Sequence, residues 1–189
     1  MINVLHLTSS FGLGGGAEKN LLRLVCNMDR SAFHNTVVTM TDIIADRDYE
    51  CLRAQLSGTE VPVYSLGMRP GRPAVASTAC LLRIIRHTQP VILQSWMYPA
   101  DLLGLLVGRI AGVPSVAWNL RCSSMDMKHY RWLSGLVLRI LIPLSRLPEV
   151  VIANSESGIQ AHKALGYAPR RWLYKIGRAS CRERVCLYV

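Results

Sequence analysis

Ile2-Asn-Val-Leu-His-Leu-Thr8, followed by Ser9-Ser-Phe-Gly-Leu-Gly-Gly-Gly-Ala-Glu18, is the stretch of sequence that decides the fold. Apolar and β-branched residues are frequent enough among its first seven residues to predict a buried strand. Four glycines in five positions come next, and leucines and valines then recur at helical spacing over residues 17–28. The sequence therefore predicts a strand, a glycine loop and a helix, which is how a parallel α/β sheet begins.

The rest of the chain repeats this alternation. Apolar runs predict further strands at 34–41, 61–66, 91–95, 115–119 and 150–154, and helices are predicted around 46–56, 74–87, 101–111 and 155–165, with long helical sequence before residue 150. Six short strands with helical crossovers indicate a doubly wound, Rossmann-like α/β domain whose parallel sheet is covered on both faces. Ligands of such sheets bind at the carboxyl ends of the strands.

Composition narrows the class of protein. The chain has 189 residues, of which 50% are hydrophobic and 18% charged, so a disordered or collagen-like chain is excluded. No apolar run reaches the length of a spanning helix, and the start lacks the basic segment of a signal peptide. The six cysteines have no CxxC spacing, which favours reduced thiols over disulfides or zinc. We expect a cytoplasmic protein with no metal.

The formal net charge of +10 is unevenly placed, because half of it lies in the last twenty residues. The remaining basicity suits anionic substrates or an anionic membrane surface. Aromatic residues are sparse and not interleaved with Lys or Arg, so no nucleic-acid partner is expected. The apolar segment 131–147 carries Arg131, Arg139 and Arg146. It is either a core helix or one that lies on the inner face of the cytoplasmic membrane.

The glycine loop allows two interpretations beyond a flexible turn. Its backbone can approach a ligand closely, and the following helix offers free N–H groups to an anion. Gly12, Gly14 and Ala17 fit the dinucleotide fingerprint, which with Asp42 suggests an NAD-dependent oxidoreductase. Asp42, however, follows Gly12 by 30 residues, where about 20 is usual. A P-loop is excluded because no Gly-Lys-Ser/Thr follows the glycines.

Three motifs, in this order, resemble the N-terminal half of GT-B glycosyltransferases of the large family-4 group. They are Gly-Gly-Ala-Glu at 15–18, Met-Tyr-Pro-Ala-Asp-Leu-Leu-Gly-Leu-Leu-Val-Gly-Arg-Ile-Ala-Gly-Val-Pro at 97–114, and Val-Ile-Ala-Asn-Ser-Glu-Ser at 151–157. The resemblance spans about residues 2–173. Trp-Asn-Leu-Arg at 118–121 also resembles members that build bacterial surface polysaccharides.

The resemblance implies the acceptor-side domain of an enzyme that moves a sugar from a nucleotide-sugar to a glycan or lipid-linked acceptor. Such enzymes retain anomeric configuration and use no metal, and the nucleotide-sugar is a co-substrate, so no cofactor is expected. Gly14, Gly15, Gly16 and Glu18 would face the donor diphosphate across a cleft. The family's donor domain has no counterpart in this sequence, so no catalytic residue is assigned.

Other candidate residues lie at or near the expected carboxyl edge of the sheet. Each of these residues is a candidate for contact with the acceptor, and the alternative is a structural role in strand-end packing, helix capping or surface solvation. They are Gln94, Trp96, Asp101, Asn119, Arg121 and Glu156. Ser155 is expected to cap the last helix. His6 lies inside the first strand and is expected to be a core histidine rather than a base.

The C-terminal tail departs from the pattern. Ile176-Gly-Arg-Ala-Ser-Cys-Arg-Glu-Arg-Val-Cys186 resembles the translation of a sequencing adapter, although a natural basic tail is the alternative. We therefore expect a domain over 1–173 and a non-native or disordered tail over 174–189, which truncates the gene and leaves the chain alone inactive. A third class, a non-enzymatic binding module, also fits a chain that ends near residue 189.

Overall fold

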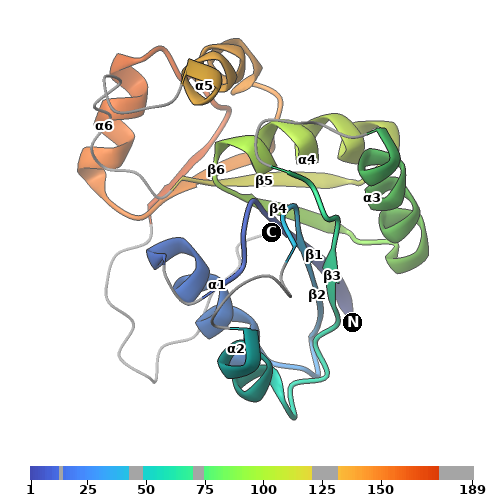
Figure 1. The fold of residues 1–189 in the computed structure, drawn as a ribbon. Helices are drawn as coiled ribbons and strands as arrows, with labels where there is room; N and C mark the ends of the chain where they lie inside the picture. The colour runs from blue at the N-terminus through green and yellow to red at the C-terminus, as the bar shows by residue number, and fades with distance from the viewer. Residues whose placement is uncertain (13–14, 43–48, 70–74, 121–131, 175–189) are drawn as a thin grey trace.

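The computed structural model describes residues 1–12, 15–42, 49–69, 75–120 and 132–174, and contains one parallel sheet with helices on both faces (Figure 1). The predicted doubly wound, Rossmann-like α/β fold is confirmed. The strand order is β3-β2-β1-β4-β5-β6-β7, and every neighbouring pair is parallel. In chain order the elements are β1 (Ile2–Thr8), α1 (Gly16–Asn27), β2 (Phe33–Thr39), α2 (Tyr49–Leu56), β3 (Val63–Ser65), α3 (Val75–Thr88), β4 (Ile92–Trp96), α4 (Tyr98–Ile110), β5 (Ser115–Leu120), α5 (Trp132–Leu144), β6 (Val150–Ala153), α6 (Glu156–Ala164) and β7 (Trp172–Tyr174).

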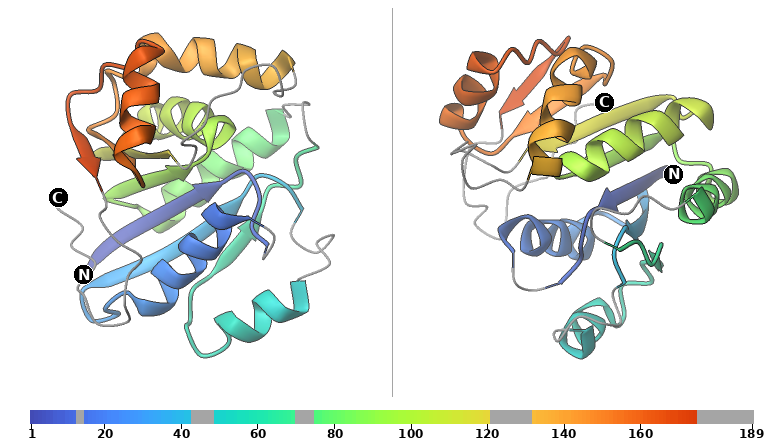
Figure 2. Two further views of the ribbon diagram at one scale, coloured as in Figure 1. Left: turned by 90° about the vertical axis from the view of Figure 1, so that its left-hand side faces the viewer. Right: turned by 45° about the horizontal axis from the view of Figure 1, so that its top comes forward.

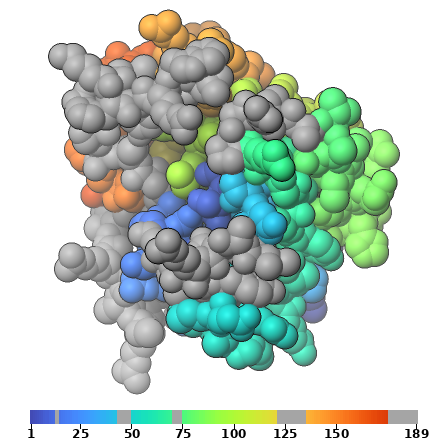
Figure 3. Space-filling model, viewed as in Figure 1, coloured from blue at the N-terminus to red at the C-terminus, as the bar shows by residue number. Residues whose placement is uncertain are grey.

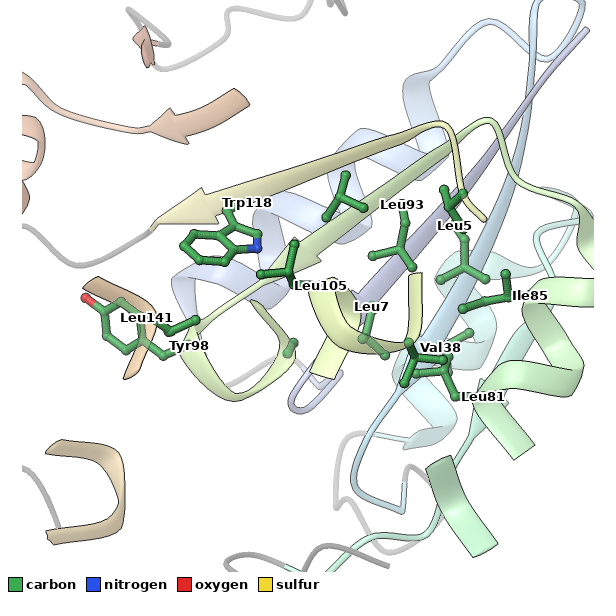
Figure 4. Packing of buried hydrophobic residues seen from close by; sticks show 14 of the residues in the cluster. Leu5, Leu7, Val38, Leu81, Ile85, Leu93, Tyr98, Leu105, Trp118 and Leu141 are labelled. Carbon is green, nitrogen blue, oxygen red and sulfur yellow. The ribbon is translucent and has the colours of Figure 1, made fainter. Parts of the chain in front are cut away.

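Alternation along the strands divides the core into two layers, one on each face of the sheet. Leu5 and Leu7 of β1 point toward α3, α4 and α5 and belong to a cluster that includes Leu81, Leu105 and Leu141. Figure 4 shows these side chains converging between the sheet and the helices. On the other face, Val37 and Trp96 pack with the leucines of α1 and with Leu52 of α2. The two helix layers are separate in both views of Figure 2.

Helix α4 lies close to the centre of the sheet because it carries glycine where it crosses the strands. A Cβ built on Gly104 would lie 2.9 Å from Leu93 Cδ2 and 3.3 Å from Leu7 Cδ2. Gly108 is similarly crowded by Leu93 and Val116. Both glycines therefore set how closely α4 approaches the sheet, a packing role that needs the absent side chain.

The structure corrects two details of the predicted elements. The sheet has seven strands, because Trp172–Tyr174 pairs with β6 as β7. Helix α4 begins at Tyr98, three residues before the predicted start, because Pro99 lies in its first turn, where its missing N–H costs no hydrogen bond. Asp101 consequently lies inside α4, and the N-cap residue of α4 is Met97. The expected tail was 174–189; Tyr174 is the last residue of β7, and residues 175–189 lie outside the described residues.

Candidate functional site

The candidate site lies where the chain changes direction across the sheet. From β1 the chain proceeds to β2 and β3 on one side, and it then returns to β4, which pairs with the other side of β1. The loops that leave β1 and β4 therefore diverge at neighbouring carboxyl ends, and this reversal of strand order is where open α/β sheets bind ligands. In the space-filling view, dark-blue atoms of the first segment lie beside light-blue atoms from the region of β2 (Figure 3).

The glycine loop is closed by Glu18 of α1. The Glu18 carboxylate accepts a hydrogen bond from the Gly15 backbone N–H at 2.6 Å and another from the Ser10 hydroxyl at 2.5 Å. Gly15 is the cap residue of α1, and a Cβ there would collide with Glu18 Oε2. Glu18 thus fills the role of the acidic residue in a capping box, so its local contacts explain its presence.

Gly16, by contrast, is exposed, and a Cβ on it would meet nothing within 4 Å. It is the first residue of α1, whose amino end points free backbone N–H groups outward, as every helix does. Of Gly15 and Gly16, therefore, Gly16 is the one where the missing side chain leaves open space. Gly14, the remaining predicted glycine of the loop, lies outside the described residues.

The ends of β1 and β2 are tied together beyond the sheet. The Met40 N–H donates to the Thr8 carbonyl at 2.9 Å, and the Thr41 N–H donates to the Ser9 carbonyl at 3.2 Å. The Thr8 hydroxyl donates to the Ser10 carbonyl at 2.7 Å. These bonds fix the first residues of the loop, so the loop leaves the sheet in a defined direction.

Met97 lies beside this loop, directly after β4. Its backbone has φ 76° and ψ 150°, a conformation that residues other than glycine rarely adopt. Its side chain is 38% exposed, and its Sδ atom lies 3.4 Å from the Ser9 hydroxyl. The two loops that diverge at the reversal point therefore contact each other through Ser9 and Met97.

Gln94, Trp96 and Asn119, three of the predicted acceptor-side residues, are placed in the sheet rather than on its rim. They are 3%, 1% and 2% exposed. Trp96 pairs in register with Asn119 and with Thr8, and Gln94 pairs with His6. Gln94 Oε1 and Asn119 Oδ1 are buried without a hydrogen-bond partner among the residues described.

His6 is a buried core histidine, as predicted. Its Nε2 lies 3.1 Å from Asn35 Oδ1, an acceptor, so Nε2 carries the proton. Burial lowers the pKa of His6 from 6.5 to about 4, and the Asn35 bond opposes this only in part. His6 is therefore neutral at physiological pH, behind the ring of Trp96 at a centroid distance of 6.3 Å.

Asp101 is fully buried under the first turn of α4, on the opposite face of the sheet from Gln94 and Trp96. Ser95 Oγ lies 2.5 Å from its Oδ1, and its backbone N–H donates to the Met97 carbonyl at 3.0 Å. Burial raises the pKa of Asp101 well above its ordinary value, despite the Ser95 hydrogen bond. Asp101 thus acts within the fold, where it links β4 to α4 around Met97.

A buried aromatic group continues from Asp101 toward α6. The Tyr98 hydroxyl lies 3.0 Å from His162 Nε2, while His162 Nδ1 lies 2.7 Å from the Gly158 carbonyl. The carbonyl can only accept, so Nδ1 carries the proton and Tyr98 donates to Nε2. Burial raises the pKa of Tyr167, whose ring packs edge-on against His162.

The last two predicted residues lie apart from this group. Glu156 is exposed at the start of α6 and accepts a hydrogen bond from Gln160 at 2.9 Å. Ser155 caps that helix, as predicted, by accepting from the Gly158 N–H at 3.0 Å. Arg121 lies outside the described residues.

Sequence reasoning missed Ser9 and Met97 as site residues. Ser9 directly precedes the recognised loop, so its position at a strand end was a usable signal. Met97 is the first residue of the motif at 97–114, but the sequence did not predict its place in the site, because that depends on a backbone conformation that methionine normally avoids.

Two further findings concern metal sites and membrane-spanning helices. Over its described ranges, no three His, Cys, Asp or Glu side chains are grouped so as to hold a metal ion. None of the helices in those ranges is long and apolar enough to cross a membrane.

The fold is similar to one half of several solved enzymes of the GT-B type. HepE of Anabaena, solved with UDP and glucose, superimposes with a TM-score of 0.65 at 18% identity, over 90% of this chain and 44% of that one. UDP-GlcNAc 2-epimerase of Neisseria meningitidis, bound to UDP-GlcNAc, gives 0.59 at 13% identity over 92% and 45%. MurG of Acinetobacter baumannii gives 0.59 at 13% identity over 98% and 47%.

These likenesses establish the fold, a Rossmann-like half of a GT-B architecture. The chain spans less than half the length of each of these structures. Compared by sequence, it matches no protein-family model and no curated protein.

Proposed function

We propose that this chain is the acceptor-side half of a GT-B glycosyltransferase of the family-4 type. The main support is that three features lie at the same edge of the sheet. They are the reversal of strand order, the open space around Gly16 at the start of α1, and Met97 directly after β4. The comparison supports the same class, since HepE has UDP and glucose bound and shares this half-fold.

The groups present at the site suggest which part of the reaction this domain supports and which part a second domain supports. Backbone N–H groups at the start of α1 provide a preformed partner for a diphosphate, and an open Gly16 lets that group approach. Neutralising the leaving diphosphate is a large electrostatic demand, which we assign to a second domain facing this edge. The reaction would transfer a sugar from a nucleotide-sugar to a glycan or lipid-linked acceptor of a bacterial surface polysaccharide, without a metal or further cofactor.

The test is an assay of the complete gene product, whose downstream codons are first read by resequencing the locus. The protein is incubated with a panel of nucleotide-sugars and with glycan and lipid-linked acceptors. Release of nucleoside diphosphate that depends on an acceptor supports the proposal. A change of configuration at C2 of the sugar, with the nucleotide still attached, would instead indicate an epimerase, which the likeness to the Neisseria enzyme favours. Tight NADH binding without any response to nucleotide-sugars would support the oxidoreductase alternative.

We also infer that α4 and α5 contact an anionic membrane surface. Exposed apolar side chains on these helices and at Leu147, which follows α5, are here called the α4–α5 surface; they are Leu106, Ile110, Leu136, Ile140 and Leu147. Arg109 of α4 donates a 2.6 Å hydrogen bond to the carbonyl of Leu147, which links α4 to the segment that follows α5. Arg109, Arg139 and Arg146 are exposed beside it, so their charges complement anionic lipid headgroups.

A further inference from the structure

Met97 is held in an unfavourable backbone conformation at the edge of the sheet where ligands bind. Among the described residues other than glycine, positive φ occurs at Glu60, Gln89 and Met97. Glu60 and Gln89 precede strands β3 and β4, at the opposite end of the sheet. Only the Met97 conformation therefore lies beside the candidate site, and strain of this kind gathers at functional positions.

The surrounding structure enforces this conformation from both sides. Trp96 is buried with the α1 cluster, whereas Tyr98 is buried in the cluster under α4, so the chain must change faces across Met97. The Ser95 hydroxyl bonds Asp101, and the Asp101 N–H bonds the Met97 carbonyl, which closes the turn. Glycine would adopt the same turn without strain, so the fold does not call for a methionine here.

Packing does not explain the Met97 side chain either. It is 38% exposed, and its sulfur lies 3.4 Å from the Ser9 hydroxyl, next to the loop that leads to Gly16. A thioether and a hydroxyl at this spacing form a small surface that is apolar on one side and polar on the other. Ligand sites combine these two characters, and methionine adapts its shape to what it contacts.

We propose that Met97 is a substrate-contacting, specificity-determining residue whose thioether packs on the C–H face of a sugar ring, with the Ser9 hydroxyl bonding a ring hydroxyl. The inference rests on the proposed function, because that function supplies a sugar as the ligand of this edge. The sugar of the donor and the sugar of the acceptor share this chemistry.

The test observes the methionine methyl groups of the 189-residue chain by NMR after ¹³C-methyl labelling. The chain has seven methionines, and the Met97 signal is assigned as the one lost in Met97→Leu. The probes are methyl glycosides of glucose, galactose, mannose and N-acetylglucosamine, the matching UDP-sugars, and UDP alone. We expect the Met97 signal to shift with a sugar-bearing probe and not with UDP. A shift with a methyl glycoside indicates the acceptor sugar, and a shift only with a UDP-sugar indicates the donor sugar.

Two methionines serve as internal controls. Met1 is 82% exposed at the start of β1, at the opposite end of the sheet, and Met28 is 6% exposed, so neither should shift. A Met97 signal that stays still with every sugar overturns the inference, whatever the transfer assay gives. A Met97 shift in a protein whose complete gene product transfers no sugar supports the contact and overturns the proposed function instead.

A pair of substitutions separates sugar contact from backbone strain. Met97→Gly and Met97→Ala both remove the thioether, and each should raise the dissociation constant of the responding sugar about tenfold. Only Met97→Gly also relieves the positive φ, so it should unfold at a higher temperature than Met97→Ala. Unchanged sugar affinity in Met97→Gly, with its melting temperature above that of Met97→Ala, would assign Met97 a role in the turn alone and overturn the inference.

Discussion

Ser95 Oγ and Asp101 Oδ1 lie 2.5 Å apart, and neither residue is exposed to solvent. Ser95 Oγ also lies 3.3 Å from the Ala117 carbonyl, and a hydroxyl has one proton to give. A neutral Asp101 resolves this competition, because its own O–H donates to Ser95 and frees the serine proton for Ala117. The raised pKa of Asp101 favours that neutral form.

The first prediction concerns stability against pH at Asp101. Because its pKa is raised in the folded state, folding takes up a proton above the ordinary pKa of 3.8. The free energy of unfolding should therefore fall as pH rises from there toward the folded pKa, by up to about 1.4 kcal/mol per pH unit. Asp101→Asn keeps a donor for Ser95, its amide N–H, and should remove this slope. Urea unfolding between pH 5 and pH 8 measures it, and parallel curves for the two proteins would contradict the assignment.

His6 should produce the opposite trend. Its pKa is about 4 in the folded state against 6.5 ordinarily, so acidification protonates the unfolded chain first. Stability should fall by about 2 kcal/mol between pH 7 and pH 5 on this account. His6→Gln, which can still donate to Asn35, should lose most of that dependence. His162 shifts in the same direction, so some slope remains in the variant. A full slope in His6→Gln would show that His6 is not the group responsible.

Two glycines that differ only in surroundings test the packing of α4. Gly104→Ala places a methyl group 2.9 Å from Leu93 Cδ2 and should destabilise the fold by about 1–3 kcal/mol. Gly16→Ala, where the added Cβ meets nothing within 4 Å, should leave stability unchanged or slightly higher. Thermal or urea unfolding of both variants decides, and equal stabilities would contradict the close approach of α4 to the sheet.

Gly16 also allows a test of the proposed contact between the start of α1 and the donor diphosphate. In the complete gene product, Gly16→Val should lower sugar transfer at least about a hundredfold, by blocking the approach of the donor to α1, while circular dichroism stays unchanged. Gly15 is a less suitable position, because a side chain there would displace Glu18 and alter the cap. Glu18→Gln is the control, since glutamine can still cap the helix. Normal turnover in Gly16→Val would remove the loop from the site.

Membrane contact by the α4–α5 surface is tested by sedimentation with lipid vesicles. The chain should bind vesicles that contain anionic lipid, and high salt should release it, because exposed charges are screened beyond about 8 Å at physiological ionic strength. Arg139→Gln with Arg146→Gln should weaken binding, as should Ile110→Ser, whose side chain is 71% exposed. Val75→Ser changes an 88% exposed residue outside this surface and should have no effect. Equal binding to neutral vesicles would exclude the electrostatic contribution.

The sequence by itself determined the order of strands and helices and the class of sheet. Periodicity is a local property, so the strand of Ile2–Thr8, the cap at Ser155 and the buried His6 were predicted from neighbours in the chain. The sequence also located the loop before α1, because clustered glycines indicate a turn in any tertiary context.

Only the tertiary structure decided what each candidate residue contacts. Gln94, Trp96 and Asn119 lie at the carboxyl end of the sheet, yet all three side chains are buried, and Trp96 packs against α1. Their burial depends on residues that are distant in the sequence. Asp101 was expected near a helix cap, and the approach of Ser95 from β4 made it a buried link instead. The conformation of Met97 arises because Trp96 and Tyr98 must enter cores on opposite faces of the sheet. No local propensity encodes that requirement, since it exists only once both helix layers have packed.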